Sequence, residues 1–146
     1  MIDTNIVIPL ALVPLLLIAQ IYLFSRASGW QTLARRYPLR GPFPPPKTRM
    51  GDGVFRGWIG YNGGIVVASD HAGLYLRAMP VVLSFCHDPI FIPWSDVTRI
   101  ARESGALARG FRIATAQAPE VRFALRASTF ALVRADAQAA GVTGRF

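Results

Sequence analysis

The residues of this chain whose types could do chemistry together are Cys86, His87 and Asp88. A thiol, an imidazole and a carboxylate are the groups of a nucleophilic catalytic triad. Three consecutive residues cannot converge in that way, because the nucleophile, the base and the orienting acid of such sites come from separate parts of a chain. We therefore interpret Cys86 as a small buried thiol beside a loop histidine, and we predict that the protein is not an enzyme.

Metal and cofactor sites are not indicated either. Cys86, His87 and the distant His71 lack the spacing of zinc ligands. The glycine motifs GDG (51–53) and NGG (62–64) are typical of hairpins and not of phosphate-binding or dinucleotide-binding loops. We expect no metal, no cofactor, no small-molecule substrate and no nucleic acid. A single cysteine allows no internal disulfide, which fits a reducing compartment.

The charge balance is basic, with 16 Lys and Arg residues against 8 Asp and Glu residues in 146. Such an excess suggests contact with anionic lipid, nucleic acid or an acidic partner. All but one of these cations are arginines in a chain rich in alanine, glycine and proline, a bias that GC-rich coding produces by itself. Composition therefore does not choose among these partners.

A membrane-spanning segment is predicted at residues 6–24, IVIPLALVPLLLIAQIYLF, which carry no charge. At ~1.5 Å per residue a helix of this length spans close to the ~30 Å hydrocarbon core. A cleaved signal peptide is the alternative, but Asp3 and no cation precede the apolar run, which favours a retained anchor over residues 1–25. The cations that follow the span predict a bacterial inner-membrane protein with its N-terminus outside and its C-terminal domain in the cytoplasm: Arg26, Arg35, Arg36, Arg40, Lys47 and Arg49.

Residues 26–50 are interpreted as a juxtamembrane segment. Ser28 and Gln31 have the spacing of a capping box, so a short helix is expected from residue 29 to before Pro38. Trp30 and Tyr37 lie on its apolar face, and Arg35 and Arg36 lie elsewhere around it. These four residues are candidates for contact with the membrane interface, although Trp30 and Tyr37 could instead pack on the following domain.

Five prolines then occupy residues 38–46, which predicts a stiff extended spacer that holds the domain off the bilayer. A PxxP ligand for an aromatic groove is the alternative use of this segment.

From residue 51 the apolar pattern predicts a mainly-β domain of about seven strands, over residues 51–146. We expect strands at 54–61 and 65–69 joined by an NGG hairpin, a third strand at 74–79 after a DHAG turn, and an irregular segment at 80–88. Further strands are expected at 91–94, 97–103, 111–115 and 121–126. The two prolines in and before 91–94 place that strand at a sheet edge.

The register of the last hairpin can also be predicted. Pairing Thr115 with Val121 is preferred to pairing Gln117 with Val121, because the second choice sets Arg112 opposite Arg126. A final helix is expected from Ser128, as its cap, through Ala140 to a stop at Gly141. Its apolar face would be Phe130, Val133, Ala137 and Ala140.

The order of seven strands and a C-terminal helix is that of a pleckstrin-homology-like barrel. The sequences GLYL at 73–76 and PIFIPWSDV at 89–97 resemble those of small bacterial membrane proteins with a pleckstrin-homology-like domain, mostly of unknown function. The resemblance covers roughly residues 51–140 and implies this fold and a general scaffold role. It departs from the phosphoinositide-binding branch, because Arg56 is the only cation between residues 54 and 69.

The candidate surface for a partner or for lipid consists of Phe91, Trp94, Arg112, Arg122 and Arg126. Packing of Trp94 and simple solvation of the arginines are the alternatives, and the apolar loop around Met79 and Phe85 is either core or a second contact surface. We expect a non-catalytic, membrane-anchored accessory or scaffold protein that docks its β domain onto a larger inner-membrane complex. The alternative is an autonomous module that binds anionic lipid at the membrane surface.

Overall fold

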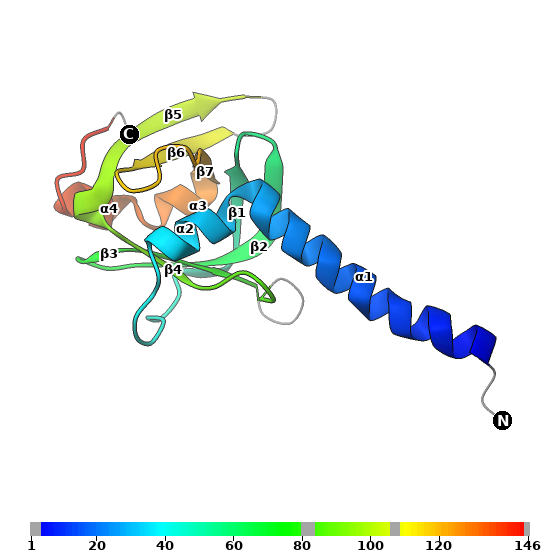
Figure 1. Cartoon of the computed structure of the whole chain (residues 1–146). Helices are drawn as coiled ribbons and strands as arrows, with labels where there is room; N and C mark the ends of the chain where they lie inside the picture. The colour runs from blue at the N-terminus through cyan, green and yellow to red at the C-terminus, as the bar shows by residue number, and fades with distance from the viewer. Residues whose placement is uncertain (1–3, 80–83, 106–108, 145–146) are drawn as a thin grey trace.

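One long helix leads into a curled seven-stranded antiparallel sheet with short helices packed against it (Figure 1). The computed structural model describes residues 4–79, 84–105 and 109–144, with residues 4–11 as backbone only. The helical elements are α1 (Thr4–Ser28), α2 (Trp30–Arg36), the 3₁₀ turn η1 (Trp94–Asp96), α3 (Ala127–Ala131) and α4 (Arg134–Ala139). The strands are β1 (Thr48–Phe55), β2 (Ile59–Ser69), β3 (Gly73–Ala78), β4 (Ile90–Pro93), β5 (Val97–Ser104), β6 (Arg109–Thr115) and β7 (Phe123–Arg126).

Helix α1 projects away from the sheet (Figure 1). Its large apolar side chains between Leu12 and Leu23 are mostly exposed, with Val13 at 64% and Leu16 at 63%. Counted over the residues that the structure fully describes, no single helix is long and apolar enough to cross a membrane. The bent pair Leu12–Ser28 and Trp30–Arg36, which meet at 69°, passes the same test of length and composition.

The strands lie in the order β4-β3-β2-β1-β7-β6-β5, so β1 joins the two halves by pairing with both β2 and β7. The mainly-β prediction is therefore confirmed. The expected hairpin at NGG is wrong, because the β1–β2 turn is Arg56-Gly57-Trp58, where Arg56 and Gly57 have the two positive φ angles of a type I′ turn. The NGG residues instead bulge within β2 opposite Asp52, whose Oδ1 accepts the Gly63 N–H at 2.6 Å.

Strand β4 lies at the edge of the sheet, as its prolines predict. Its outer side is nevertheless covered, because the Phe91 N–H donates to the Tyr37 carbonyl at 2.9 Å and the Leu39 N–H donates to the Pro89 carbonyl at 3.2 Å. The proline-rich segment, predicted as a stiff extended spacer, lies against the sheet. The Arg77 guanidinium lies 4.7 Å from the Phe43 ring centre, and the Lys47 N–H donates to the Val67 carbonyl.

The register of β6 and β7 is confirmed. Phe111 pairs with Leu125 and Ile113 with Phe123, which is the alignment that keeps Arg112 away from Arg126. The C-terminal helix is also present, but as α3 and α4, because the Val133 N–H bonds to the carbonyl three residues back and tightens the turn between them.

The ends of this helical segment differ in part from the prediction. Arg126, not Ser128, is the N-terminal cap residue, and Gly141 with φ 71° follows the last turn as expected. Ala137 is buried, whereas Ala140 is exposed.

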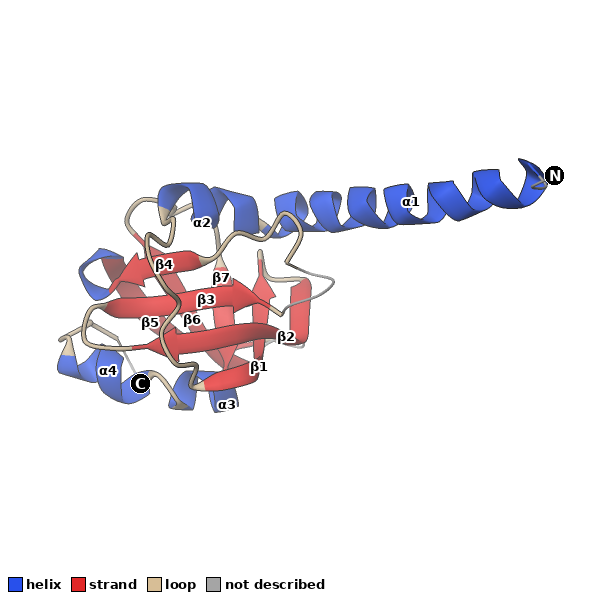
Figure 2. Ribbon diagram, turned by 90° about the horizontal axis from the view of Figure 1, so that it is seen from below, coloured by secondary structure: helices blue, strands red, loops and turns tan. Residues whose placement is uncertain are grey.

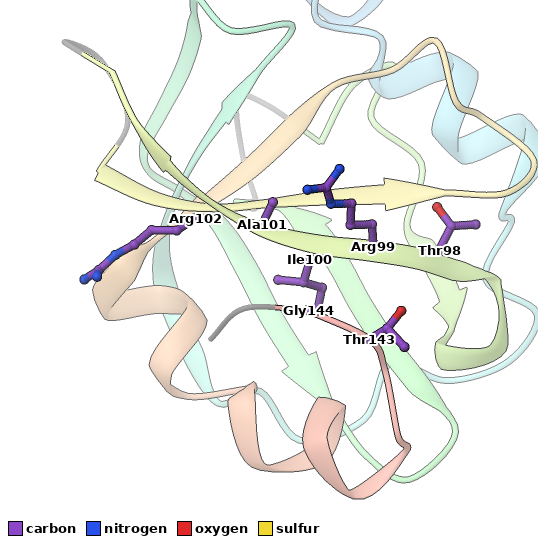
Figure 3. A pocket seen from close by; sticks show the side chains of 7 residues that line it. All are labelled: Thr98, Arg99, Ile100, Ala101, Arg102, Thr143 and Gly144. Carbon is purple, nitrogen blue, oxygen red and sulfur yellow. The ribbon is translucent and has the colours of Figure 1, made fainter.

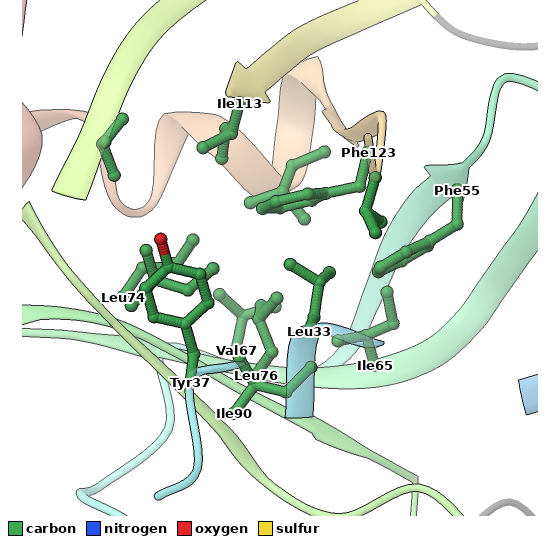
Figure 4. Packing of buried hydrophobic residues seen from close by; sticks show 14 of the residues in the cluster. Leu33, Tyr37, Phe55, Ile65, Val67, Leu74, Leu76, Ile90, Ile113 and Phe123 are labelled. Atoms are coloured by element: carbon green, nitrogen blue, oxygen red, sulfur yellow. The ribbon is translucent and has the colours of Figure 1, made fainter. Parts of the chain in front are cut away.

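The core lies inside the curl of the sheet, between α2 on one side and α3 and α4 on the other (Figure 2). Leu33 of α2 and Tyr37, which follows the helix, point among side chains from both halves of the sheet, including Phe55 and Ile113 (Figure 4). The folded domain therefore includes residues well before the expected boundary at residue 51.

Candidate functional site

Among the described residues the outer edge of β5 is covered only in part, and a groove of about 910 Å³ lies along it. The C-terminal segment forms its other wall, where Ile100 and Gly144 make a parallel bridge and the Ile100 N–H donates to the Thr143 carbonyl at 3.3 Å. Figure 3 shows the groove with the side chains of Arg99 and Arg102 along the strand. One strand-like contact thus occupies an edge that still has room for an extended segment.

An arginine face adjoins this groove and consists of Arg99, Arg112 and Arg122 on β5, on β6 and just before β7. The three side chains line a second hollow of about 280 Å³, and Arg99 lines both hollows. Alternation along β6 and β7 turns these positions outward, while Phe111, Ile113 and Phe123 are buried. Of the described residues, none forms an ion pair with an arginine of this face, so its charge is free to meet an acidic ligand.

Two of the three predicted surface arginines therefore lie together, and Arg126 is apart from them. The Arg126 guanidinium donates to Asn62 Oδ1 at 3.0 Å, which engages it at the β2 bulge. Sequence reasoning missed Arg99 and Arg102. They lie on opposite faces of β5, and the groove beside them is formed by the C-terminal segment, which is far away in the sequence.

The predicted aromatic part of the surface belongs to the fold. Trp94 is buried and its Nε1–H donates to the Asp70 carbonyl at 2.8 Å, so the packing alternative is the correct one. Phe91 is half-buried, and its ring centre lies 4.7 Å from that of Tyr75. Neither residue offers a free aromatic face at an open edge.

The membrane-interface candidates divide in the same way. Trp30 and Tyr37 are buried in the core, so the prediction that they contact lipid is wrong and the domain-packing alternative is confirmed. Their rings fill the space under the sheet, and the Trp30 Nε1–H donates to the Asp88 carbonyl at 2.9 Å. Arg35 and Arg36 are exposed, and an Arg36 N–H donates to the Gln117 carbonyl at 3.0 Å.

Cys86, His87 and Asp88 form part of a joint between α1 and the sheet. His87 is buried, with Nε2 at 3.0 Å from the Tyr61 hydroxyl and Nδ1 at 3.0 Å from the Phe85 carbonyl. The Tyr61 hydroxyl in turn donates to Ser28 Oγ at 2.9 Å. Cys86 is exposed, so the predicted buried thiol is wrong, and its backbone carbonyl accepts a hydrogen bond from the Ser25 hydroxyl.

The hydrogen bonds of this joint hold α1 against the sheet, and they do not bring together the groups of a catalytic site. Burial raises the pKa of the Tyr61 hydroxyl and lowers the pKa of the His87 imidazole, so both side chains are held neutral. The Cys86 side chain is exposed while His87 points inward to Tyr61, which separates the two groups that nucleophilic catalysis would need together. No group of residues in the described part of the chain has the composition of a metal site.

The buried His87 predicts a pH dependence of stability. Its pKa is lowered on folding from about 6.5, so the unfolded chain binds the proton more tightly and stability falls as the pH drops below about 6.5. We expect the melting temperature of the full chain in detergent, followed by circular dichroism, to fall between about pH 7 and pH 5. In His87→Gln this slope is expected to flatten. Equal slopes in the two proteins would contradict the assignment to His87.

Asp136 does not confuse this measurement. Its carboxylate accepts a hydrogen bond from the Ser69 hydroxyl and pairs with Lys47, and these contacts lower its pKa below the ordinary 3.8. The stability that it contributes is therefore lost below the pH range of the experiment.

No protein-family model and no curated protein matches the chain.

Proposed function

We propose that this protein is a non-catalytic, membrane-anchored docking protein. In this proposal α1 is a single-pass anchor in a bacterial inner membrane with its N-terminus outside. The β domain lies in the cytoplasm and binds a larger membrane complex through the β5 groove and the arginine face. We also propose that the domain is a pleckstrin-homology-like barrel, which its strand order and C-terminal helices support.

The observation that carries the proposal is that one chain has both an exposed apolar helix and a sheet edge that is only partly covered and is bordered by cations. Exposed leucines and valines around a projecting helix are costly in water and are stabilised in lipid. An open edge can add a strand from a partner through main-chain hydrogen bonds, and Arg99 and Arg102 favour a strand with acidic side chains.

The experiment compares two charge variants with equal loss of charge. The first replaces Arg99, Arg112 and Arg122 with Gln, and the matched control replaces the exposed Arg35, Arg40 and Arg49 with Gln. Tagged full-length protein is captured from its native membrane in mild detergent and the companions are quantified by mass spectrometry. At about 0.5 kcal/mol for each rim contact, the first variant is expected to hold a fixed-ratio companion roughly tenfold less well.

The control variant is expected to retain the companion. A companion that survives loss of the arginine face would contradict docking through this surface. If no companion appears, and the arginine variant instead stops binding anionic vesicles, the autonomous lipid-binding function replaces the docking function.

A further inference from the structure

Two aromatic side chains are exposed next to the helix that leaves the domain. Trp58, at the tip of the β1–β2 turn, is 66% exposed, and Phe85 is 59% exposed. The other aromatic residues in the described part of the chain after α1 are buried or half-buried. Because exposed apolar surface often marks a contact site, the exposure of these two aromatic side chains indicates that something binds there.

Trp58 lies beside the last turns of α1. It shares an apolar hollow of about 420 Å³ with Leu23, Phe24 and Ala27 of that helix. The positive φ angles of Arg56 and Gly57 make the tight turn that brings Trp58 to this position. The exposed surface of the helix is thus continuous with the hairpin tip.

Phe85 reaches the same end of α1 from another loop. The next residue, Cys86, accepts a hydrogen bond through its carbonyl from Ser25, one helical turn before the end of α1. The two loops that carry Trp58 and Phe85 therefore both contact α1 within residues 20–27.

The domain cannot swing freely about this stretch. Gly29 joins α1 to α2 with φ 83°, and a side chain at Gly29 would lie 2.9 Å from Val121. The Ser28 hydroxyl is buried against Tyr61, and the Trp30 ring contacts both Tyr61 and His87. The direction of α1 relative to the β domain is therefore fixed, so the positions of Trp58 and Phe85 relative to the helix axis are fixed as well.

The position of these rings along α1 can be compared with the expected level of the membrane surface. The apolar run ends at Phe24 and the exposed Arg26 follows, so in a membrane-spanning α1 the boundary between hydrocarbon and headgroups lies within residues 20–27. Trp58 lies level with that stretch, and Arg56 beside it is exposed. Tryptophan at the headgroup level, with arginine nearby, is the usual arrangement at a membrane interface.

We propose that Trp58 and Phe85 insert into the headgroup region of the bilayer and dock the β domain flush against the membrane. This inference rests on the proposed anchor function of α1. It replaces a domain held off the bilayer by a spacer with one whose orientation is set by two aromatic loops. The partner of this surface is the phospholipid interface and not a protein.

Tryptophan fluorescence tests the contact in the full-length chain. The protein is reconstituted in vesicles of phosphatidylcholine and phosphatidylglycerol, with or without lipids brominated near the headgroup end of their acyl chains. Because Trp30 and Trp94 are buried, lipid quenching is expected to come from Trp58 and to be mostly lost in Trp58→Phe. Adding Phe85→Trp to that variant is expected to restore quenching from the second loop.

Vesicle flotation separates this inference from the anchor on which it rests. Protein that does not float overturns the anchor function together with the contact, and Leu16→Arg provides the non-floating reference. Protein that floats but is quenched equally with and without Trp58, or is not quenched at all, overturns the aromatic contact alone. In the second case Trp58 would lie outside the lipid, and the proposed docked orientation of the β domain would be wrong.

Discussion

Replacing Trp30 with alanine is expected to lower the free energy of unfolding by about 3–5 kcal/mol, the usual cost of removing a large buried aromatic side chain. Trp30 is fully buried, and its ring centre lies 5.5 Å from that of Phe55 and 5.6 Å from that of Tyr61. The substitution also removes the donor to the Asp88 carbonyl and leaves that carbonyl without this partner. Packing and hydrogen bonding therefore act in the same direction.

Urea unfolding of the full chain in detergent, followed by circular dichroism, measures this loss. Trp58→Ala is the matched control, because it deletes the same side chain from an exposed site and is expected to change stability by less than about 0.5 kcal/mol. Similar losses in the two variants would show that α2 does not belong to the core. The membrane-interface interpretation of Trp30 would then become the better one.

Trp30 also shows why the sequence predicts a helix here but does not predict what the helix packs against. An apolar face that recurs at i, i+3, i+4 and i+7 predicted the short helix, and the structure has it as α2. The same face suits a lipid interface and a protein core equally, because both accept apolar side chains. The choice depends on whether the sheet leaves a space of matching shape, which local sequence does not contain.

The hairpins give a second instance of this limit. The β6–β7 register followed from local charge repulsion between Arg112 and Arg126 and was predicted correctly. For the β1–β2 turn, NGG is the strongest local turn signal in the sequence, yet Arg56-Gly57 makes the turn. The bulge at NGG lies opposite Asp52, so the turn was decided by pairing across strands and not by turn propensity.

The candidate site was predictable to a similar extent. Alternation predicts that Arg112 and Arg122 face outward, but it does not show that residues 37–39 cover β4 or that the C-terminal segment covers β5 only in part and leaves a groove there. Exposure of Trp58 likewise depends on the direction in which α1 leaves the domain. The alternation in the sequence therefore predicts which side chains face outward, while the arrangement of the strands decides which of them lie together.

Gly110 of β6 carries the second large effect. A Cβ added there would lie 2.1 Å from the Leu125 carbonyl oxygen and 2.9 Å from Arg126 Cα, both backbone atoms of the neighbouring strand. Backbone in a hydrogen-bonded ladder cannot yield as a flexible side chain does, so β6 and β7 must separate locally. We expect Gly110→Ala to lower the free energy of unfolding by about 1–3 kcal/mol, although alanine is usually the better residue within a strand.

The matched control for Gly110→Ala is Gly60→Ala in β2. An added Cβ at Gly60 meets nothing closer than the Asn62 side chain at 3.8 Å, so stability is expected to stay the same or to rise by up to about 1 kcal/mol. Amide hydrogen exchange should show the Gly110→Ala loss as weaker protection in β6 and β7, while β2 and β3 keep theirs. Because Gly110 pairs with Arg126 in the predicted register, equal stability of the two variants would contradict both the close approach and that register.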